Sequence, residues 1–481
     1  MPRTSFFPFW VAAAILLSPG SCFAQVPAKE PGAAARVRPQ SQSAPPNILV
    51  FMVDTLRADA LGCYGNEKIR TPHIDAFAAE STVFRQACTT VPATRPAIAS
   101  LMTGVSADVH GIFGHSDYLD GTVAGLPRLA ERLKARGYHT AALVANPNVD
   151  RVFGFARGFD SYVGLYAARH GTRPAASQDL VSDAAAVVSR TMADLDDLSG
   201  REPWFLFVLA IDPHAPYTPP APFDRIYNPA LAGARLGRMS PLLDFDRRLA
   251  AGEHPSPRAI RTLYDGEVSY LDREFGRLLA WMRRTGRLRN TLVVLTADHG
   301  EEFAEHGSRG HGKTVYEETT RVPLILRHPK FFGPAVRGEA VDLLDLGATL
   351  LAVAGATRPD HWVGRDLRAP LRPRPVISSN HLPKYALTAI RSGHLKGIEN
   401  GRTGSFEIFD LQRDPGEKVP LEGAARKRAL ALLRPLLAGY RAQVDRFRAM
   451  MARGARPVEK EAVPEAIEKT LESLGYVGGK Q

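Results

Sequence analysis

Cysteine is scarce in this sequence, and its apolar runs are short. It has three cysteines in 481 residues, and none stand at a metal-binding spacing. This scarcity argues against a disulfide-stapled scaffold and against a cysteine zinc site. If the chain is exported and loses a leader, Cys63 and Cys88 remain. They then either pair with each other or stay as buried free thiols.

Basic residues are numerous but dispersed. The formal net charge is +11, yet the arginines form no basic block with interleaved aromatic residues, so we expect no nucleic-acid partner. A basic surface suits anionic substrates, and it leaves loose association with an anionic membrane face open. The composition, 44% hydrophobic and 23% charged, is typical of globular proteins, and the length favours a large domain plus a smaller one.

The N-terminus has the features of an export signal. Arg3 is followed by a short apolar stretch over residues 6–17 and by a suitable cleavage point. The stretch is too short for a membrane span. We expect residues 1–24 to be a signal peptide and residues 25–45 to be a disordered linker. Export to the periplasm or the exterior follows, with lipid attachment through Cys22 as the less favoured alternative.

Four continuous apolar runs end in polar residues, at 47–53, 140–145, 204–211 and 291–297. Such runs are typical of strands buried on both faces of a parallel sheet, and segments of helical period separate them. The sequence therefore predicts an α/β fold with a large, mostly parallel central sheet. The polar ends place candidate site residues at the carboxyl edge of that sheet.

Helical spacing of apolar residues predicts helices over residues 259–285 and 341–353. Residues 219–256 have mixed polarity and several prolines, so we interpret them as an insertion or lid. From about residue 376, the pattern changes to short alternating runs followed by a charged helix over residues 423–450, which indicates a separate structural region. We expect three regions after the linker: a catalytic domain over 46–372, a small C-terminal α+β subdomain over 373–450, and a loosely attached tail over 451–481.

Residues 91–104 read VPATRPAIASLMTG. Pro96 suits the first turn of a helix, where its missing N–H costs nothing. Thr94 would then lie at the helix N-terminus, where free N–H groups and the dipole attract phosphate or sulfate oxygens. Helix capping by Thr94 is the alternative interpretation. The segment resembles the nucleophile region of sulfatases, in the wider alkaline phosphatase superfamily: a reactive side chain, a proline two residues on, and a closing Leu-x-Thr-Gly.

This resemblance implies an alkaline-phosphatase-like fold and a hydrolase or transferase of phosphoric or sulfuric esters. Sulfatases carry cysteine or serine at the position of Thr94, because only those two residues mature into formylglycine. We therefore expect no formylglycine here. The expected alternative is a Thr94 hydroxyl that a bound metal cation activates directly.

Two strand ends resemble the metal-binding motifs of the same superfamily. Asp54 follows the first apolar run, and Asp298 and His299 follow the fourth. The resemblance implies that these three residues hold one divalent cation and that Thr94 completes the site. Because His299 supplies a nitrogen ligand, zinc or manganese is favoured, with calcium as the alternative.

Further residues match positions near the substrate. His214, in Asp-Pro-His-Ala-Pro-Tyr, resembles a histidine that sulfatase-like enzymes keep near the leaving group. His311, in Gly-His-Gly-Lys, lies where sulfatases carry a substrate lysine, so His311 or Lys313 is expected to hold an oxyanion. Arg57 and Arg95 are candidate anion clamps, and a solvated surface role is the alternative for each.

Two departures bear on the substrate. Ile98 replaces the arginine that follows the sulfatase nucleophile by four residues, and residues 144–147 lack the lysine and histidine of the sulfatase Gly-Lys-Trp-His-Leu motif. Such cations hold sulfate in known sulfatases. A phosphate mono- or diester or a phosphonate is therefore favoured, either as a small molecule or carried on a glycan or lipid. The alternatives are a sulfuric ester hydrolase without formylglycine and a non-catalytic binding protein on a decayed enzyme fold.

Overall fold

A computed structural model of the chain describes residues 44–114, 117–123, 125–166, 182–382, 384–452, 462–474 and 476. All of these residues belong to one unit, Ala44–Gln481. The expected signal peptide and nearly all of the expected linker lie outside the described residues.

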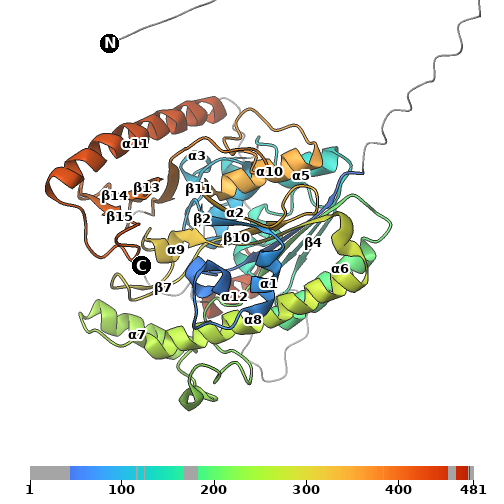
Figure 1. Cartoon of the computed structure of the whole chain (residues 1–481), viewed down its shortest axis with the longest axis horizontal. Helices are drawn as coiled ribbons and strands as arrows, with labels where there is room; N and C mark the ends of the chain where they lie inside the picture. Colours follow the sequence, from blue (N-terminus) through green and yellow to red (C-terminus); the bar gives the residue numbers. More distant parts are fainter. Residues whose placement is uncertain are drawn as a thin grey trace, which may run out of the picture. The chain divides into compact units, whose positions relative to one another are not determined.

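A large mixed sheet forms the centre of the fold (Figure 1). Its strand order is β11-β2-β10-β6-β1-β5-β3-β4, and β9 pairs with β2. The strands are β1 (Asn47–Val53), β2 (Thr82–Cys88), β3 (His139–Val144), β4 (Ser161–Gly164), β5 (Trp204–Ala210), β6 (Thr291–Ala297), β9 (Arg321–Val322), β10 (Leu324–Arg327) and β11 (Ala335–Asp342). The pairs along β6-β1-β5-β3-β4 are parallel. The prediction of a mostly parallel sheet is confirmed.

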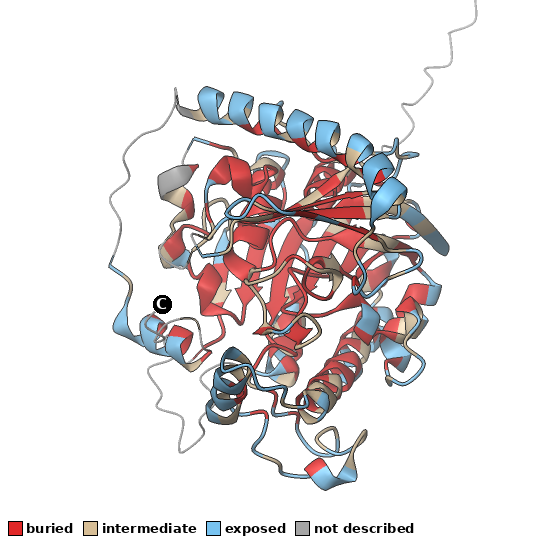
Figure 2. Ribbon diagram, turned by 90° about the vertical axis from the view of Figure 1, so that its left-hand side faces the viewer, coloured by how far each residue is buried: buried red, intermediate tan, exposed pale blue. Residues whose placement is uncertain are grey.

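The four apolar runs of the sequence are the strands β1, β3, β5 and β6. Every residue of β5 and β6 is buried, and in β1 only Asn47 is partly exposed. Figure 2 shows these strands as the buried centre of the molecule. Helices on both faces leave no solvated side on these strands, which explains their unbroken apolar character.

Two groups of helices flank the sheet on opposite faces (Figure 1). On one face, α8 (Arg258–Arg284) contacts α1 (Pro72–Ala79) and α6 (Ala184–Asp197). On the other face, α2 (Thr94–Thr103), α3 (Ala107–His110), α5 (Leu129–Ala135) and α10 (Leu343–Ala354) pack together. The helix α10 begins two residues later than predicted, because β11 extends to Asp342, whose side chain then caps α10 by accepting from the N–H of Asp345.

The segment between β5 and α8 runs over the carboxyl edge of the sheet. It contains a short turn of helix (Pro229–Leu231) and α7 (Met239–Ala250). Smaller elements near the same edge are the hairpin of β7 (Glu302–Phe303) and β8 (Arg309–Gly310), the helix α9 (Glu317–Thr320) and the short helix η3 (Pro147–Val149). None of the helices in the described ranges combines the length and apolarity that crossing a membrane requires.

A second, antiparallel sheet follows the large one. Its strands are β12 (Val376–Asn380), β13 (Leu387–Ser392), β14 (Leu395–Asn400) and β15 (Phe406–Asp410), and the long helix α11 (Gly423–Ala452) packs on them. Buried charges fasten this sheet to the larger part: Lys396 of β14 pairs with Glu317 at 3.1 Å and with Glu417 at 2.9 Å. The small C-terminal α+β part is thus confirmed.

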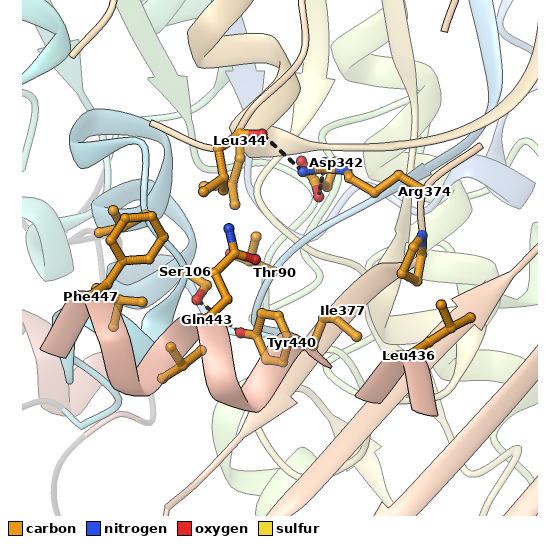
Figure 3. A pocket seen from close by; sticks show the side chains of 15 residues that line it. Thr90, Ser106, Asp342, Leu344, Arg374, Ile377, Leu436, Tyr440, Gln443 and Phe447 are labelled. Atoms are coloured by element: carbon orange, nitrogen blue, oxygen red, sulfur yellow. Dashed lines mark hydrogen bonds and ion pairs between the residues drawn. The ribbon is translucent and has the colours of Figure 1, made fainter. Parts of the chain in front are cut away.

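A cavity of about 240 Å³ lies between α11 and the larger part of the fold (Figure 3). Mainly apolar side chains line it, together with the ion pair of Asp342 and Arg374. The described residues of its lining include none of the predicted catalytic or metal-binding residues. We interpret it as a packing gap beneath α11.

Part of the region that we expected to be a loose tail is packed against the core. The helix α12 (Glu465–Ser473) buries Ile467 and Leu471, and Leu474 follows it into the main hydrophobic core. The helix contacts η3 at the carboxyl edge of the central sheet. Tyr476 comes two residues after Leu474 and reaches the site described next.

Candidate active site

Two neighbouring strands bring the predicted metal ligands together. β1 and β6 are parallel and in register, with Val53 opposite Ala297, so the residues that follow them emerge side by side. Asp54, Asp298 and His299 are all fully buried. They offer ligand atoms that all lie within 4.8 Å of one another.

The donor set fits a cation. Oδ1 of Asp54 and Oδ2 of Asp298 are buried without a hydrogen-bond partner, and they lie 3.7 and 3.5 Å from Nε2 of His299. The Nδ1–H of His299 donates to the carbonyl of Gly300 at 2.9 Å, which leaves the Nε2 lone pair facing the two carboxylates. Buried polar atoms without partners are costly, and a divalent cation would satisfy all three at once.

Burial and mutual repulsion shift the pKa values of the Asp54 and Asp298 carboxyls. Burial, reinforced by the nearby charge of Asp298, raises the pKa of the Asp54 carboxyl well above its ordinary value. Burial likewise raises the pKa of the Asp298 carboxyl. Two carboxylates that resist ionisation next to each other form a strong cation site, because a bound cation removes the cause of the shift.

Thr94 lies at the mouth of this donor set. It is the first residue of α2, is buried, and its Oγ1 lies 3.2 Å from Nε2 of His299. Because α2 points its N-terminus at the site, the helix dipole favours a negative charge at Thr94. The predicted position of Thr94 at a helix N-terminus is therefore what the structure shows.

His214 and His311 lie beside the donor set, with their imidazole rings tilted relative to one another. The ring of His311 is 4.4 Å from that of His299 and 5.1 Å from that of His214, measured between centroids. His214 donates from Nδ1 to the carbonyl of Ala215 at 2.5 Å, and burial together with the neighbouring His311 lowers its pKa to about 3. His214 is therefore neutral in the free protein, with Nε2 as an acceptor.

A cavity of about 260 Å³ opens above the site. Five of the residues predicted from sequence line it: Thr94, Arg95, His214, His311 and Lys313. His311 is held by Glu301, whose Oε1 lies 3.0 Å from Nδ1 of His311. Lys313 donates to the carbonyl of Arg309 at 2.8 Å, and its partial burial lowers its pKa.

The two predicted arginine clamps have different surroundings. Arg95 lines the cavity, but its guanidinium donates to the carbonyl of Asn148 at 2.9 Å and stacks on Phe153. Arg57 pairs with Asp59 and Glu305, both at 2.6 Å, and it is not among the residues that line the cavity. Both arginines shape the edge of the site through these contacts, and a direct contact with substrate stays a prediction.

Two further residues reach the site without having been predicted as site residues. Asn146 follows β3 and donates from Nδ2 to Oδ2 of Asp54 at 2.6 Å and to the hydroxyl of Tyr476 at 3.1 Å. The rule that found Asp54 and Asp298, a polar residue directly after a buried strand, also fits Asn146. Tyr476 hydrogen-bonds Nε2 of His214 at 2.6 Å. Its only sequence signal is the helical spacing of apolar residues just before it.

A second cluster of potential ligands is internally satisfied. Glu302, His306 and Glu318 also lie close enough to share an ion. However, Nδ1 of His306 contacts Glu318 at 2.5 Å and Nε2 contacts the carbonyl of Glu417 at 3.1 Å. Glu302 accepts from two backbone N–H groups and two hydroxyls. These contacts make the cluster a hydrogen-bonded support beneath the site.

A buried carboxylate–histidine donor set, a hydroxyl at a helix N-terminus and a flanking histidine define an ester hydrolase of the alkaline phosphatase superfamily. A sequence model described as Sulfatase matches residues 46–356. This match covers more than half of the chain, and the chain belongs to the sulfatase family.

Relatives and solved structures agree with this assignment. An arylsulfatase from Clostridium perfringens is 26% identical over 435 residues, which cover 78% of this chain and 90% of the relative. A solved structure of a protein with its substrate, D-glucosamine-2-N,6-O-disulfate, has a TM-score of 0.68 at 20% identity and covers 86% of this chain and all of that one. A phosphonate monoester hydrolase from Agrobacterium radiobacter has a TM-score of 0.64 at 22% identity, with 84% and 96% covered. The two structural matches support the fold.

Proposed function

We propose that this chain is a metal-dependent hydrolase or transferase of anionic esters in which Thr94 is the nucleophile. The observation that carries the proposal is the 3.2 Å contact between Oγ1 of Thr94 and Nε2 of His299, beside two buried carboxylate oxygens that have no hydrogen-bond partner. A divalent cation held by Asp54, Asp298 and His299 would act as a Lewis acid that lowers the pKa of the Thr94 hydroxyl.

The remaining residues of the cavity have roles that follow from their positions. Thr94 attacks the phosphorus or sulfur atom, and the α2 dipole stabilises the negative charge on the transferred group. An anionic substrate next to His214 raises the pKa of that imidazole, so that Nε2 can donate a proton to the leaving oxygen. Lys313 and His311, which line the same cavity, would neutralise charge on the substrate.

Phosphate esters or phosphonates are the favoured substrates. Thr94 has no route to formylglycine, and Ile98 is buried in the core where sulfatases have an arginine. The strand end at residue 146 supplies the neutral amide of Asn146, which is bonded to Asp54. The second candidate is a sulfuric ester hydrolase without formylglycine, which the similarity to the arylsulfatase favours.

Metal identity and cellular location complete the proposal. A nitrogen ligand from His299 beside two carboxylates favours zinc or manganese, with calcium as the alternative. The basic and apolar character of residues 1–24 supports export of the chain to the periplasm or the exterior. The substrate would then be an extracellular small molecule or an ester group on a glycan or lipid.

The test uses purified mature protein. Elemental analysis should find about one divalent cation per chain, and nitrophenyl phosphodiesters and phosphonates should be turned over faster than nitrophenyl sulfate. Sulfate turnover far above phosphate turnover would establish the second candidate instead. A protein that contains no metal and turns over none of these esters would contradict both and support a binding protein.

A further inference from the structure

Tyr476 enters the active site from the C-terminal segment of the chain. Its phenol oxygen lies 2.6 Å from Nε2 of His214 and 3.1 Å from Nδ2 of Asn146, and Tyr476 lines the same cavity as Thr94. Its ring centroid is 5.3 Å from that of His214 and 6.1 Å from that of His311. The Tyr476 hydroxyl therefore contacts the proposed proton-donating histidine inside the cavity that the proposed nucleophile also lines.

The hydroxyl of Tyr476 occupies space that the reacting group of a substrate would need. In an in-line displacement, the transferred group lies between the nucleophile and the leaving oxygen. Here the phenol oxygen of Tyr476 lies 2.6 Å from Nε2 of His214, which is where the leaving oxygen of a substrate would lie. Binding of a substrate and seating of Tyr476 are mutually exclusive.

The hydrogen bonds at Tyr476 are those expected of a released alcohol. The Nδ1–H of His214 donates to the carbonyl of Ala215, so Nε2 accepts the proton of the tyrosine hydroxyl. A leaving oxygen would take this position relative to His214 once its bond to phosphorus or sulfur has broken. Tyr476 therefore mimics a phenol product in the leaving-group position.

A small anchor holds the tyrosine in place. The side chains of Ile467, Leu471 and Leu474 are buried against the main core, whereas Glu465 and Lys469 on the outer face of α12 are exposed. An element with so few buried apolar side chains opens at a much lower free-energy cost than the core. Release of the segment is therefore compatible with an intact catalytic domain.

We infer that the C-terminal segment is an intramolecular competitive inhibitor, in which Tyr476 fills the leaving-group position as a phenol and so marks that position as a site for aryl alcohols. The inference rests on the proposed roles of Thr94 and His214. Because substrate binds only to molecules whose Tyr476 has left the site, the apparent KM rises by the reciprocal of that open fraction.

Full-length variants test this directly with a nitrophenyl ester as substrate. Tyr476→Gly should lower KM about tenfold or more without lowering kcat, and Tyr476→Phe, which keeps the ring and loses the hydroxyl, should lower it less. Glu468→Gln, on the exposed face of α12, is the matched control and should leave KM unchanged. A synthetic peptide of residues 462–481 should inhibit Tyr476→Gly competitively, and the same peptide carrying Tyr476→Phe should inhibit more weakly. A fall in kcat with unchanged KM in Tyr476→Gly would show that the tyrosine assists the chemistry, which overturns the inference.

A second measurement needs no turnover. Orthovanadate should accelerate amide hydrogen exchange in residues 465–474, in the wild type and in Thr94→Ala alike, because the oxyanion and Tyr476 compete for one space. Unchanged exchange at saturating vanadate overturns the inference even if Thr94 proves to be the nucleophile. Vanadate-driven release in a protein that turns over no ester would contradict the proposed function, on which the role of Tyr476 as a leaving-group mimic rests.

Discussion

Oγ1 of Thr94 lies 3.2 Å from Nε2 of His299, across the gap between the N-terminus of α2 and the carboxyl end of β6. The contact joins a hydroxyl to an imidazole whose other nitrogen is committed to the carbonyl of Gly300. The unpaired oxygens of Asp54 and Asp298 lie alongside. This arrangement concentrates negative charge and lone pairs at one buried point. A cation bound there would stabilise them and would activate the Thr94 hydroxyl.

Substitution of the nucleophile is the first prediction. Thr94→Ala should reduce kcat for a nitrophenyl phosphodiester by at least about 10³-fold, because the substitution removes the attacking hydroxyl. Thr94→Ser keeps a hydroxyl at the same atom and should retain turnover within about tenfold. Steady-state kinetics and thermal melts of both variants make the comparison. Near-wild-type turnover in a folded Thr94→Ala protein would remove Thr94 from the mechanism.

Metal removal should be more damaging at higher pH. Burial and the charge of Asp298 raise the pKa of Asp54 well above its ordinary value of 3.8. The folded metal-free protein therefore keeps a proton that the unfolded chain has lost, and its stability falls as the pH rises above about 4. A bound cation removes this penalty, so the gain in Tm on adding metal should be larger at about pH 8 than at about pH 5.

The matched variant for this measurement is Asp54→Asn. The amide oxygen of Asn can still accept from Asn146, and the buried charge is gone. Its metal-free form should be more stable than that of the wild type at about pH 8, and added metal should no longer raise Tm. A metal-dependent gain in Tm that does not vary with pH would contradict the assignment of Asp54.

His214 should matter most for poor leaving groups. His214→Gln should lower kcat for an alkyl ester by about 10²-fold and for a nitrophenyl ester far less, since nitrophenolate leaves without a proton. The pKa of His214 is lowered to about 3 by burial and by His311, so the free enzyme holds it neutral throughout the neutral range. His214 should therefore contribute no inflection near pH 6.5 to the profile of kcat/KM against pH, and the wild type and His214→Gln should have profiles of the same shape in that range.

Lys313 should act on substrate binding. It lines the same cavity as Thr94 and His214. Lys313→Met should raise KM for an anionic ester about tenfold and change kcat little, because its charge meets substrate and transition state alike. Lys313→Arg should restore most of the affinity, and Lys68→Met, at an exposed position, should have no effect. Equal losses in Lys313→Met and Lys68→Met would indicate a general effect of surface charge.

The sequence predicted those parts of the site that follow from local pattern. Asp54, Asp298 and His299 follow buried strands, and adjacent parallel strands deliver such residues to one edge. Thr94 was located by a helix-start pattern and by the resemblance to sulfatases. The same edge rule applied to β3 would have added Asn146.

Long-range packing decided what the sequence could not show. Tyr476 reaches His214 from a position 262 residues later in the chain, and no local pattern reports such a contact. Arg57 was expected near the anion, yet its guanidinium is shared by Asp59 and Glu305. Asp59 is a local partner, but Glu305 comes from a loop 248 residues later, which composition and periodicity do not encode.

The most direct test of the central claim is mass spectrometry of acid-quenched reactions with a nitrophenyl phosphodiester or phosphonate. The account predicts a phosphoryl or phosphonyl adduct on the side chain of Thr94 that accumulates during turnover and is absent from Thr94→Ala. Steady turnover with no adduct at Thr94, or with an adduct on a different residue, would contradict it.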